Sequence, residues 1–187
     1  MKRMRKNEGF TLIELLIVVA IIGIIAAIAI PGLLRARMSG NEASAIGSMR
    51  ALNSAEATFA ASCGGGGYAN AFAQLSTAPM GGQPFISPDL LNANTTGKSG
   101  YWYQMGGVGA QILVNTATCN AVGASTTTFA VQGSPGTNAA PGYGTTGQRH
   151  FFTNQTGTIW QDSAQTDGFD PTLATDPVVG GTITILQ

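Results

Sequence analysis

One apolar segment near the start of the chain, residues 10–34, limits what this sequence can fold into. The segment holds about 25 residues with a single charged side chain, Glu14, and as an α-helix it would extend roughly 37 Å, enough to cross a bilayer. Four basic side chains precede it: Lys2, Arg3, Arg5 and Lys6. By the positive-inside rule, this end stays in the cytoplasm and the chain beyond Leu34 is exported.

The acid inside the apolar segment is unusual. A carboxylate costs about 2.5–3.5 kcal/mol at the centre of a membrane and less near its edge, so Glu14 requires a cationic partner. The apolar segment itself contains no basic side chain that could reach it. A free α-amino group at Phe10, produced by cleavage after Gly9, would be such a partner.

The sequence GFTLIE at residues 9–14, after a short basic leader, resembles the type III signal sequence of type IV pilins and of the pseudopilins of type II secretion. The resemblance extends through Pro31. It implies that a prepilin peptidase cleaves between Gly9 and Phe10, that the new amine of Phe10 is methylated, and that the apolar segment stays in the mature protein. It also implies that Glu14 neutralises the amine of a neighbouring subunit and so sets the register of a filament.

Two other interpretations of this segment remain open. A conventional secretory signal also has a basic start and an apolar run, and residues 27–29 form an acceptable cleavage site, after which the mature chain would begin at Ile30. An ordinary single-span anchor explains the hydropathy, but it explains neither Glu14 nor the Gly-Phe junction.

Loss of the leader, residues 1–9, changes the charge of the chain. The full sequence has 9 basic and 9 acidic side chains, and removal of the leader leaves five basic against eight acidic ones. Binding to phosphate backbones depends on clustered lysine and arginine. Nucleic acid is therefore not an expected partner.

The two cysteines, Cys63 and Cys119, both lie on the exported side. An even number of cysteines in an oxidising compartment favours a disulfide, and closing a loop of about 57 residues would stabilise the fold by about 4 kcal/mol. Two free buried thiols or a redox pair are the alternatives. The spacing of cysteine and histidine does not indicate a metal site.

The N-terminal helix is expected to continue beyond the apolar segment. Pro31 and Gly32 should bend it or melt one turn, because proline removes a backbone hydrogen bond. Residues 35–62 predict an amphipathic helix with an apolar stripe at three- and four-residue spacing: Ala45, Met49, Leu52, Ala55 and Phe59. Its polar residues are expected largely on other faces: Arg37, Asn41, Glu42, Ser48 and Asn53.

Residues 63–100 are rich in glycine, proline, asparagine and alanine, and they predict a long connecting loop. Within it, residues 87–91 suit one helical turn, with Ser87 as the cap and Pro88 at the first position. In the family that the sequence resembles, this connection is exposed or contacts another subunit.

Residues 101–161 follow the period of β-strands, separated by glycine-rich turns, and the tail from residue 162 is rich in turns until Gly181. The predicted strands are 101–105, 111–115, 126–132, 148–153 and 158–161. The clearest hairpin is 150–160, and residues 182–186 are either an edge strand or an ordered tail.

The predicted fold class is α+β. Consecutive, closely spaced strands should form a small antiparallel sheet, whose apolar face needs a cover. The amphipathic half of the long helix, residues 35–62, is the best cover, so helix on sheet follows. This is the pilin fold that the resemblance implies: leader 1–9, membrane-spanning helix 10–34, amphipathic helix 35–62, loop 63–100, and sheet with C-terminal tail 101–187.

No residue pattern indicates an enzyme or a cofactor. His150 is the only histidine, and the chain has no GxSxG motif that would supply a nucleophile. Four acids near the C-terminus are weak candidates for Ca²⁺, since major pseudopilins hold calcium in such a loop: Asp162, Asp167, Asp170 and Asp176. A solvated acidic loop is the alternative.

The sequence therefore predicts a structural subunit of a type IV pilus-like filament, which polymerises through its N-terminal helix after cleavage by the prepilin peptidase. The alternatives are a type II secretion pseudopilin in a periplasmic pseudopilus, and a membrane-anchored binding domain that never polymerises. Expected partners are further copies of the chain, the peptidase, and the assembly machinery in the inner membrane. The subunit should reside in that membrane first, with its N-terminus in the cytoplasm, and then in an extracellular pilus or a periplasmic pseudopilus.

Overall fold

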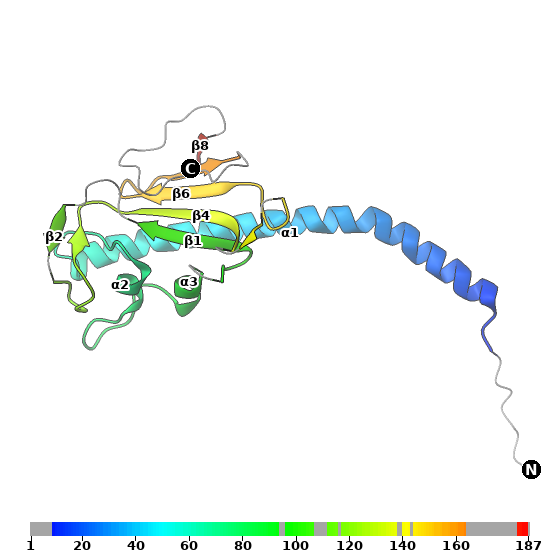
Figure 1. Cartoon of the computed structure of the whole chain (residues 1–187), viewed down its shortest axis with the longest axis horizontal. Helices are drawn as coiled ribbons and strands as arrows, with labels where there is room; N and C mark the ends of the chain where they lie inside the picture. The colour runs from blue at the N-terminus through cyan, green and yellow to red at the C-terminus, as the bar shows by residue number, and fades with distance from the viewer. Residues whose placement is uncertain are drawn as a thin grey trace, which may run out of the picture. The chain divides into compact units, whose positions relative to one another are not determined.

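The structure is a computed structural model of the whole chain. It describes residues 9–93, 96–106, 112–115, 117–137, 140–142, 144–163 and 183–186. One long helix, α1 (Leu12–Ser62), precedes two short helices and a set of antiparallel strands (Figure 1). Contacts within the chain divide it into two units, with the division between Arg37 and Met38, inside α1.

The helix α1 is continuous through Pro31 and Gly32. The expected melted turn is therefore not formed. Proline removes only one backbone hydrogen bond, and nearby alanine and leucine residues favour the helix on both sides of it. A bend at this position stays a prediction.

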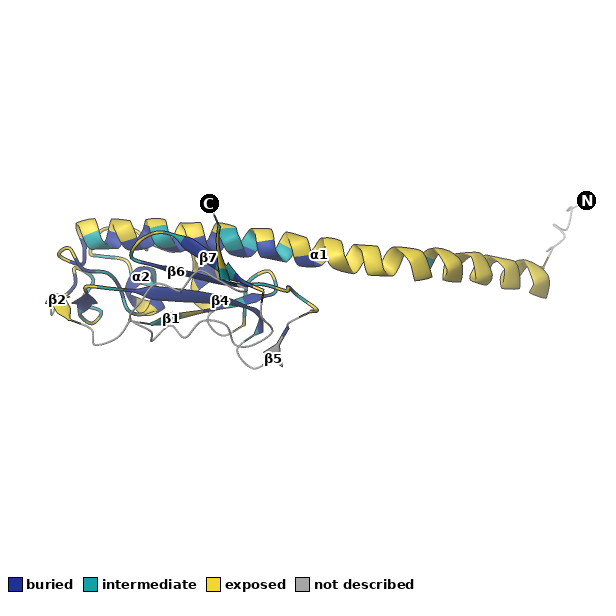
Figure 2. Ribbon diagram, turned by 90° about the horizontal axis from the view of Figure 1, so that it is seen from above, coloured by how far each residue is buried: buried dark blue, intermediate teal, exposed yellow. Residues whose placement is uncertain are grey.

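Burial along α1 changes at Met38. Among the described residues before it none is buried, whereas a buried stripe follows the helix from Met38 to Phe59 (Figure 2). The predicted apolar stripe, Ala45, Met49, Leu52, Ala55 and Phe59, is buried throughout, which confirms that this half of the helix covers the sheet.

The same stripe also holds polar residues, and here the prediction was wrong. Glu42 and Ser48 are buried, and so is Glu56. Buried positions alternate at spacings of four and three: Met38, Glu42, Ala45, Met49, Leu52, Glu56 and Phe59. The helical period places both acids on the covered face, and their partners described below explain how they are accommodated.

The main sheet has six antiparallel strands in the order β1-β4-β6-β7-β8, with β5 paired to β4. Its strands are β1 (Tyr101–Gly106), β4 (Ala130–Thr137), β5 (Ala140–Pro141), β6 (His150–Asn154), β7 (Ile159–Asp162) and β8 (Ile183–Leu186). A separate two-stranded sheet pairs β2 (Leu113–Asn115) with β3 (Ser125–Thr126).

The predicted hairpin is confirmed, since β6 and β7 pair Phe152 with Trp160 across the ladder. Of the two alternatives left open for residues 182–186, the structure has the edge strand: β8 pairs with β7.

The predicted single strand 126–132 is wrong. The chain leaves the small sheet at Thr126 and enters the main sheet only at Ala130. Thr126 is held elsewhere, because it exchanges both backbone hydrogen bonds with Tyr68, at 2.8 and 3.0 Å. As a result β1 pairs with β4 rather than with the strand that follows it in sequence.

The connection after α1 contains two short helices, α2 (Phe72–Ser76) and α3 (Pro88–Asn92). The helical turn predicted at residues 87–91 is thus confirmed, with Pro88 in its first turn and Ser87 at the N-cap position. This connection follows the outer edge of β1, where Tyr103 N–H donates to the carbonyl of Ala93 at 3.1 Å.

Aromatic side chains fill both faces of the main sheet. Tyr101, Tyr103 and Phe151 belong to the core beneath α1, whereas Phe152 and Trp160 form a second cluster with Ala130. Neighbouring residues of β6 thus point to opposite faces, as the pleat of a strand requires.

Candidate functional site

The N-terminal end of α1 forms a capping box. The backbone N–H and the hydroxyl of Thr11 both donate to Oε2 of Glu14, at 2.9 and 2.7 Å. In return, the backbone N–H of Glu14 donates to Oγ1 of Thr11 at 3.2 Å. Thr11 therefore acts as the N-cap and Glu14 as the third helical residue of a T-x-x-E motif.

This geometry gives Glu14 a role that the sequence interpretation missed, although the T-x-x-E spacing was visible. The carboxylate lies at the positive end of the helix dipole and accepts donors that the helix leaves unpaired. Only Oε2 makes these bonds. The side chain is exposed, so its carboxylate is accessible to a partner from outside.

The helix that starts at this cap exposes all its large apolar side chains up to Leu34. Their exposed fractions range from 47 % at Leu34 to 78 % at Leu12. Burial of one such side chain contributes about 1.5–3 kcal/mol. Among the described residues, α1 is the one helix that is long and apolar enough to cross a membrane. This surface requires either lipid or other protein chains around it.

The two residues of the expected cleavage site lie just before the helix. Gly9 and Phe10 are not helical, and the side chain of Phe10 is 87 % exposed. A peptide bond outside regular structure is accessible to a protease. Cleavage and methylation at this bond stay predictions.

At the other end of α1, a disulfide joins Cys63 to Cys119, as the sequence predicted, with 4.7 Å between the Cα atoms. The backbone N–H of Cys119 also donates to the carbonyl of Cys63 at 3.1 Å. Next to this pair, Ser125 Oγ donates to the carbonyl of Gly64 at 2.6 Å. The end of the helix is thus fixed to the segment that leads into β3.

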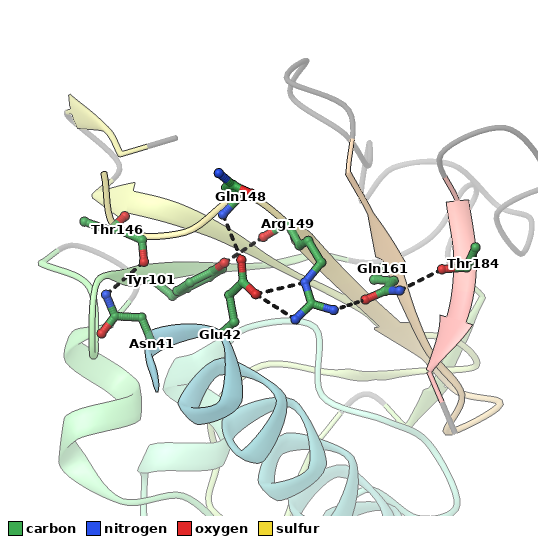
Figure 3. A network of polar contacts seen from close by, with 8 residues as sticks. All are labelled: Asn41, Glu42, Tyr101, Thr146, Gln148, Arg149, Gln161 and Thr184. Carbon is green, nitrogen blue, oxygen red and sulfur yellow. Dashed lines mark hydrogen bonds and ion pairs between the residues drawn. The ribbon is translucent and has the colours of Figure 1, made fainter. Parts of the chain in front are cut away.

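Where α1 first reaches the sheet, Glu42 and Arg149 form an ion pair (Figure 3). Oε2 of Glu42 accepts from Nε and Nη2 of Arg149, at 2.9 and 2.6 Å, and Oε1 accepts from the backbone N–H of Gln148 at 2.9 Å. Beside it, Asn41 donates to the carbonyl of Thr146 at 2.8 Å. We call Glu42 and Arg149 the neck clamp.

Further hydrogen bonds connect the neck clamp to β8 at the edge of the sheet. Nη1 of Arg149 donates to Oε1 of Gln161 at 2.6 Å, and Nε2 of Gln161 donates to Oγ1 of Thr184 at 2.8 Å (Figure 3). The carbonyl of Arg149 accepts from the hydroxyl of Tyr101 at 2.8 Å. A row of polar contacts therefore links α1 to β8.

The second buried acid has a different environment. Glu56 is fully buried, and its Oε2 accepts from the backbone N–H of Ala69 at 2.9 Å. Oε1 has no hydrogen-bond partner among the described residues. Burial raises the pKa of Glu56 to about 8, against a smaller opposing effect of the Ala69 hydrogen bond, so its carboxyl group is mostly protonated at pH 7.

The other candidate residues are placed as follows. His150 is buried in β6, with Nδ1 at 3.1 Å from the hydroxyl of Ser134. Asp162 is buried in β7, and the remaining calcium candidates, Asp167, Asp170 and Asp176, lie outside the described residues. Within the described part of the chain, no group of three histidine, cysteine or acidic residues could hold a metal ion.

Comparison with known families gives a match at the N-terminus. Residues 4–30 match the family model of the prokaryotic N-terminal methylation motif. No solved structure matches the chain.

Three curated proteins are similar to the chain. The type IV major pilin protein PilA of Myxococcus xanthus is 50 % identical over 54 residues, which are 29 % of this chain and 24 % of that protein. The type IV wide pilus major component PilA4 of Thermus thermophilus is 64 % identical over 39 residues, 21 % of this chain and 30 % of that protein.

The third is the type II secretion system core protein G of Vibrio cholerae, 42 % identical over 55 residues, 29 % of this chain and 38 % of that protein. In all three cases, the similarity spans well under half of the relative's own length. The methylation motif, the exposed apolar helix and the helix-on-sheet architecture agree with one another, and together with these similarities they support a type IV pilin or pseudopilin.

Proposed function

We propose that this chain is the structural subunit of a type IV pilus-like filament and that it polymerises through α1. The observation that carries the proposal is the continuous apolar surface of residues 12–34, exposed along its length and headed by an accessible carboxylate at Glu14. In the membrane, lipid covers this surface. In a filament, the equivalent helices of other copies cover it, and the partner interactions are repeated along a helical array.

Processing comes first in this proposal. The prepilin peptidase cleaves between Gly9 and Phe10, and the new amine of Phe10 is methylated. The amine stays cationic after methylation, and it pairs with Glu14 of a neighbouring copy. An ammonium group beside the carboxylate offsets part of the cost of placing an acid in an apolar environment. Each subunit can then add only at the axial position where the two charges meet.

The capping box adds a constraint to this step. Oε2 of Glu14 is engaged by Thr11 of its own chain. We propose that the carboxylate serves both purposes, with Oε2 capping its own helix and Oε1 accepting from the incoming amine. The cap would then hold the carboxylate in place before the neighbour arrives.

Before assembly, the subunit resides in the inner membrane with its N-terminus in the cytoplasm and the sheet on the exported side. Similarity to a type II secretion core protein favours a second candidate, a pseudopilin that forms a periplasmic pseudopilus. In both cases, the partners are further copies of the chain, the prepilin peptidase and the assembly machinery of the inner membrane.

The decisive experiment shears filaments from the cell surface and determines by mass spectrometry where their main protein begins. A chain that starts at methylated Phe10 supports the pilus. The same start in a protein found only in the periplasm supports the pseudopilus. A chain that keeps residues 1–9, or that starts after the apolar segment, contradicts both candidates.

Two variants separate the roles of the carboxylate. Glu14→Gln keeps an acceptor for the cap and removes the charge, whereas Thr11→Ala keeps the charge and removes the capping hydroxyl. If the charge sets the register, Glu14→Gln inserts into the membrane but assembles poorly, and Thr11→Ala assembles nearly as well as the wild type. Equal losses in both variants would mean that capping, and not pairing with a neighbour, is what matters.

A further inference from the structure

We propose that Arg35 and Arg37 bind the phosphate groups of anionic phospholipids in the leaflet on the exported side, so that the unassembled subunit selects these lipids from the membrane. The inference rests on the proposed function, because it concerns the stage at which the subunit resides in the membrane. Both arginines lie in the first unit of the chain, residues 1–37, and not in the second, residues 38–187, which we call the head.

The two arginines directly follow the apolar surface of α1. Residues 12–34 are helical throughout, and as a helix they span about 33 Å, close to the thickness of the hydrocarbon core of a bilayer. When this segment fills the core, Arg35 and Arg37 lie within about 5 Å of its end. That is the level of the lipid headgroups.

Neither arginine has an anionic partner in the part of the chain that the structure describes. Both are exposed, and the ion pairs of the described residues involve other cations. Residues 15–41 contain two basic and no acidic side chains, so no carboxylate lies three or four residues away on the helix. The next acid, Glu42, is held by Arg149. Both guanidinium groups are therefore available to anions from outside the chain.

The positions of the two arginines around the helix favour lipid as that partner. At about 100° per residue, Arg35 and Arg37 project roughly 160° apart, on nearly opposite sides of α1. None of residues 12–37 is buried (Figure 2). A protein that docks on one side of the helix would reach only one of the arginines, whereas lipids surround a single helix and reach both.

The surface next to each guanidinium group suits a phospholipid. Side chains on a helix lean toward its N-terminus, so Arg37 leans toward Leu33 and Leu34, which are 58 and 47 % exposed. Arg35 leans toward Gly32, where a Cβ would meet no atom within 4 Å. An acyl chain can lie along this open surface while its headgroup phosphate accepts hydrogen bonds from the arginine, whose planar donors match a phosphate.

Processing makes this contact the main charged anchor of the subunit. Cations on the exported side oppose the positive-inside rule, and the four basic side chains of the leader outweigh them in the precursor. After the proposed cleavage, Arg35 and Arg37 are the basic side chains that remain next to the apolar segment. Anionic headgroups attract such cations, so the processed subunit is held at the exported leaflet.

The test measures which lipids the unassembled full chain retains. The protein in a neutral detergent is mixed with equal amounts of phosphatidylglycerol and phosphatidylcholine that have the same acyl chains. It is then isolated, and its retained lipid is quantified by mass spectrometry. An arginine near a headgroup favours the anionic lipid by roughly fivefold. The wild type should therefore retain about five times more phosphatidylglycerol than phosphatidylcholine, and high salt should reduce this preference.

Matched variants assign the preference to the two arginines. A chain with both Arg35→Gln and Arg37→Gln should retain the two lipids equally. Arg50→Gln is the control, because Arg50 is also exposed on α1 and has no ion pair among the described residues, but it lies about 20 Å further along the helix. This control should keep the preference of the wild type. Glycerol phosphate, the same anion without acyl chains, should not displace the retained phosphatidylglycerol at equal concentration.

Equal retention of the two lipids by the wild type would overturn the proposal, and so would a preference that survives in the double variant. Loss of the preference in Arg50→Gln would mean that the charge of the whole chain selects the lipid. Displacement by glycerol phosphate would overturn lipid as the partner. No lipid preference in the wild type, together with failed assembly of the double variant, would assign the arginines to a contact between copies.

Each of these results leaves the proposed function intact, because the start of the filament protein is determined independently. A native protein that lacks residues 10–34 would overturn the proposed function, and the lipid contact would fail with it.

Discussion

The buried carboxyl group of Glu56 makes the stability of this protein depend on pH. Its pKa is 4.5 in an unfolded chain and about 8 in the folded protein, chiefly because burial removes the carboxylate from water. Between these two values, the folded state holds a proton that the unfolded state has released. The stability of the folded state therefore falls as the pH rises through this range.

The magnitude follows from the two pKa values. Each pKa unit corresponds to about 1.4 kcal/mol, so the full effect is about 5 kcal/mol. About 3 kcal/mol of it is already lost at pH 7 relative to pH 4. This is a large fraction of the 5–15 kcal/mol that typically separates folded from unfolded proteins.

The perturbation is Glu56→Gln, which is neutral at every pH. The amide oxygen can keep the hydrogen bond from Ala69, so the variant should match the wild type near pH 4 and exceed it by about 4 kcal/mol at pH 8 and about 5 kcal/mol at pH 9 and above. Its stability should change little with pH in this range. The assay is denaturant unfolding of the full chain in detergent, followed by the fluorescence of the buried Trp160.

Glu42→Gln is the matched control, because Glu42 occupies the same stripe of α1 and is ion-paired. Loss of its charge should destabilise the protein at neutral pH by about 1–3 kcal/mol, the opposite sign to Glu56→Gln. A wild-type stability that varies by less than about 1 kcal/mol between pH 5 and 8 would refute the reasoning. So would a Glu56→Gln variant with the same pH dependence as the wild type.

Three further predictions concern the head. Reduction of the Cys63–Cys119 disulfide should lower the free energy of unfolding by about 4 kcal/mol, measured by denaturant titration with and without reductant; an unchanged midpoint would contradict this. Gly147→Ala should lower the free energy of unfolding by about 3 kcal/mol or more, because the new Cβ would overlap the hydroxyl of Tyr101. A variant with the stability of the wild type would contradict this packing. Gly47→Ala, on an open face of α1 with no atom within 4 Å of the new Cβ, should stabilise the monomer by about 1 kcal/mol in the same assay, and a loss would show that this face is not free.

The sequence predicted those parts of the fold that depend on local periodicity. The stripe from Ala45 to Phe59 follows a helical period, and the hairpin of β6 and β7 follows alternation around a glycine-containing turn. Both signals lie within a short stretch of chain. The apolar helix and its single acid could also be located in the sequence, because an unbroken run of apolar residues is a local feature.

Contacts between distant segments were not predictable in this way. The strand expected at residues 126–132 is divided because Thr126 pairs with Tyr68, a residue far away in the sequence. The strand β1 pairs with β4 for a similar reason, since β2 and β3, which lie between them in the sequence, pair with each other in the small sheet. Pairings of this kind depend on the whole arrangement of the head.

Of the two buried acids of α1, Glu42 was assigned to another face because acids usually lie at the surface, although the helical spacing places both Glu42 and Glu56 on the covered face. The partner of Glu42 is Arg149, and the donor to Glu56 is the backbone of Ala69. Neither partner can be recognised before the fold is known. The capping box at Thr11 and Glu14 is different, because its spacing is local and a search for helix caps would have found it.

The positions of the neck clamp and the disulfide have a mechanical consequence. The helix α1 is tied to the rest of the head near residue 42 by an ion pair and at residue 63 by a covalent bond. In the filament that we propose, tension along α1 would act on these two attachments as shear. The Glu42–Arg149 ion pair can break and re-form, whereas the disulfide limits how far the end of α1 moves relative to the segment around Cys119, so the contact can yield near residue 42 and then recover.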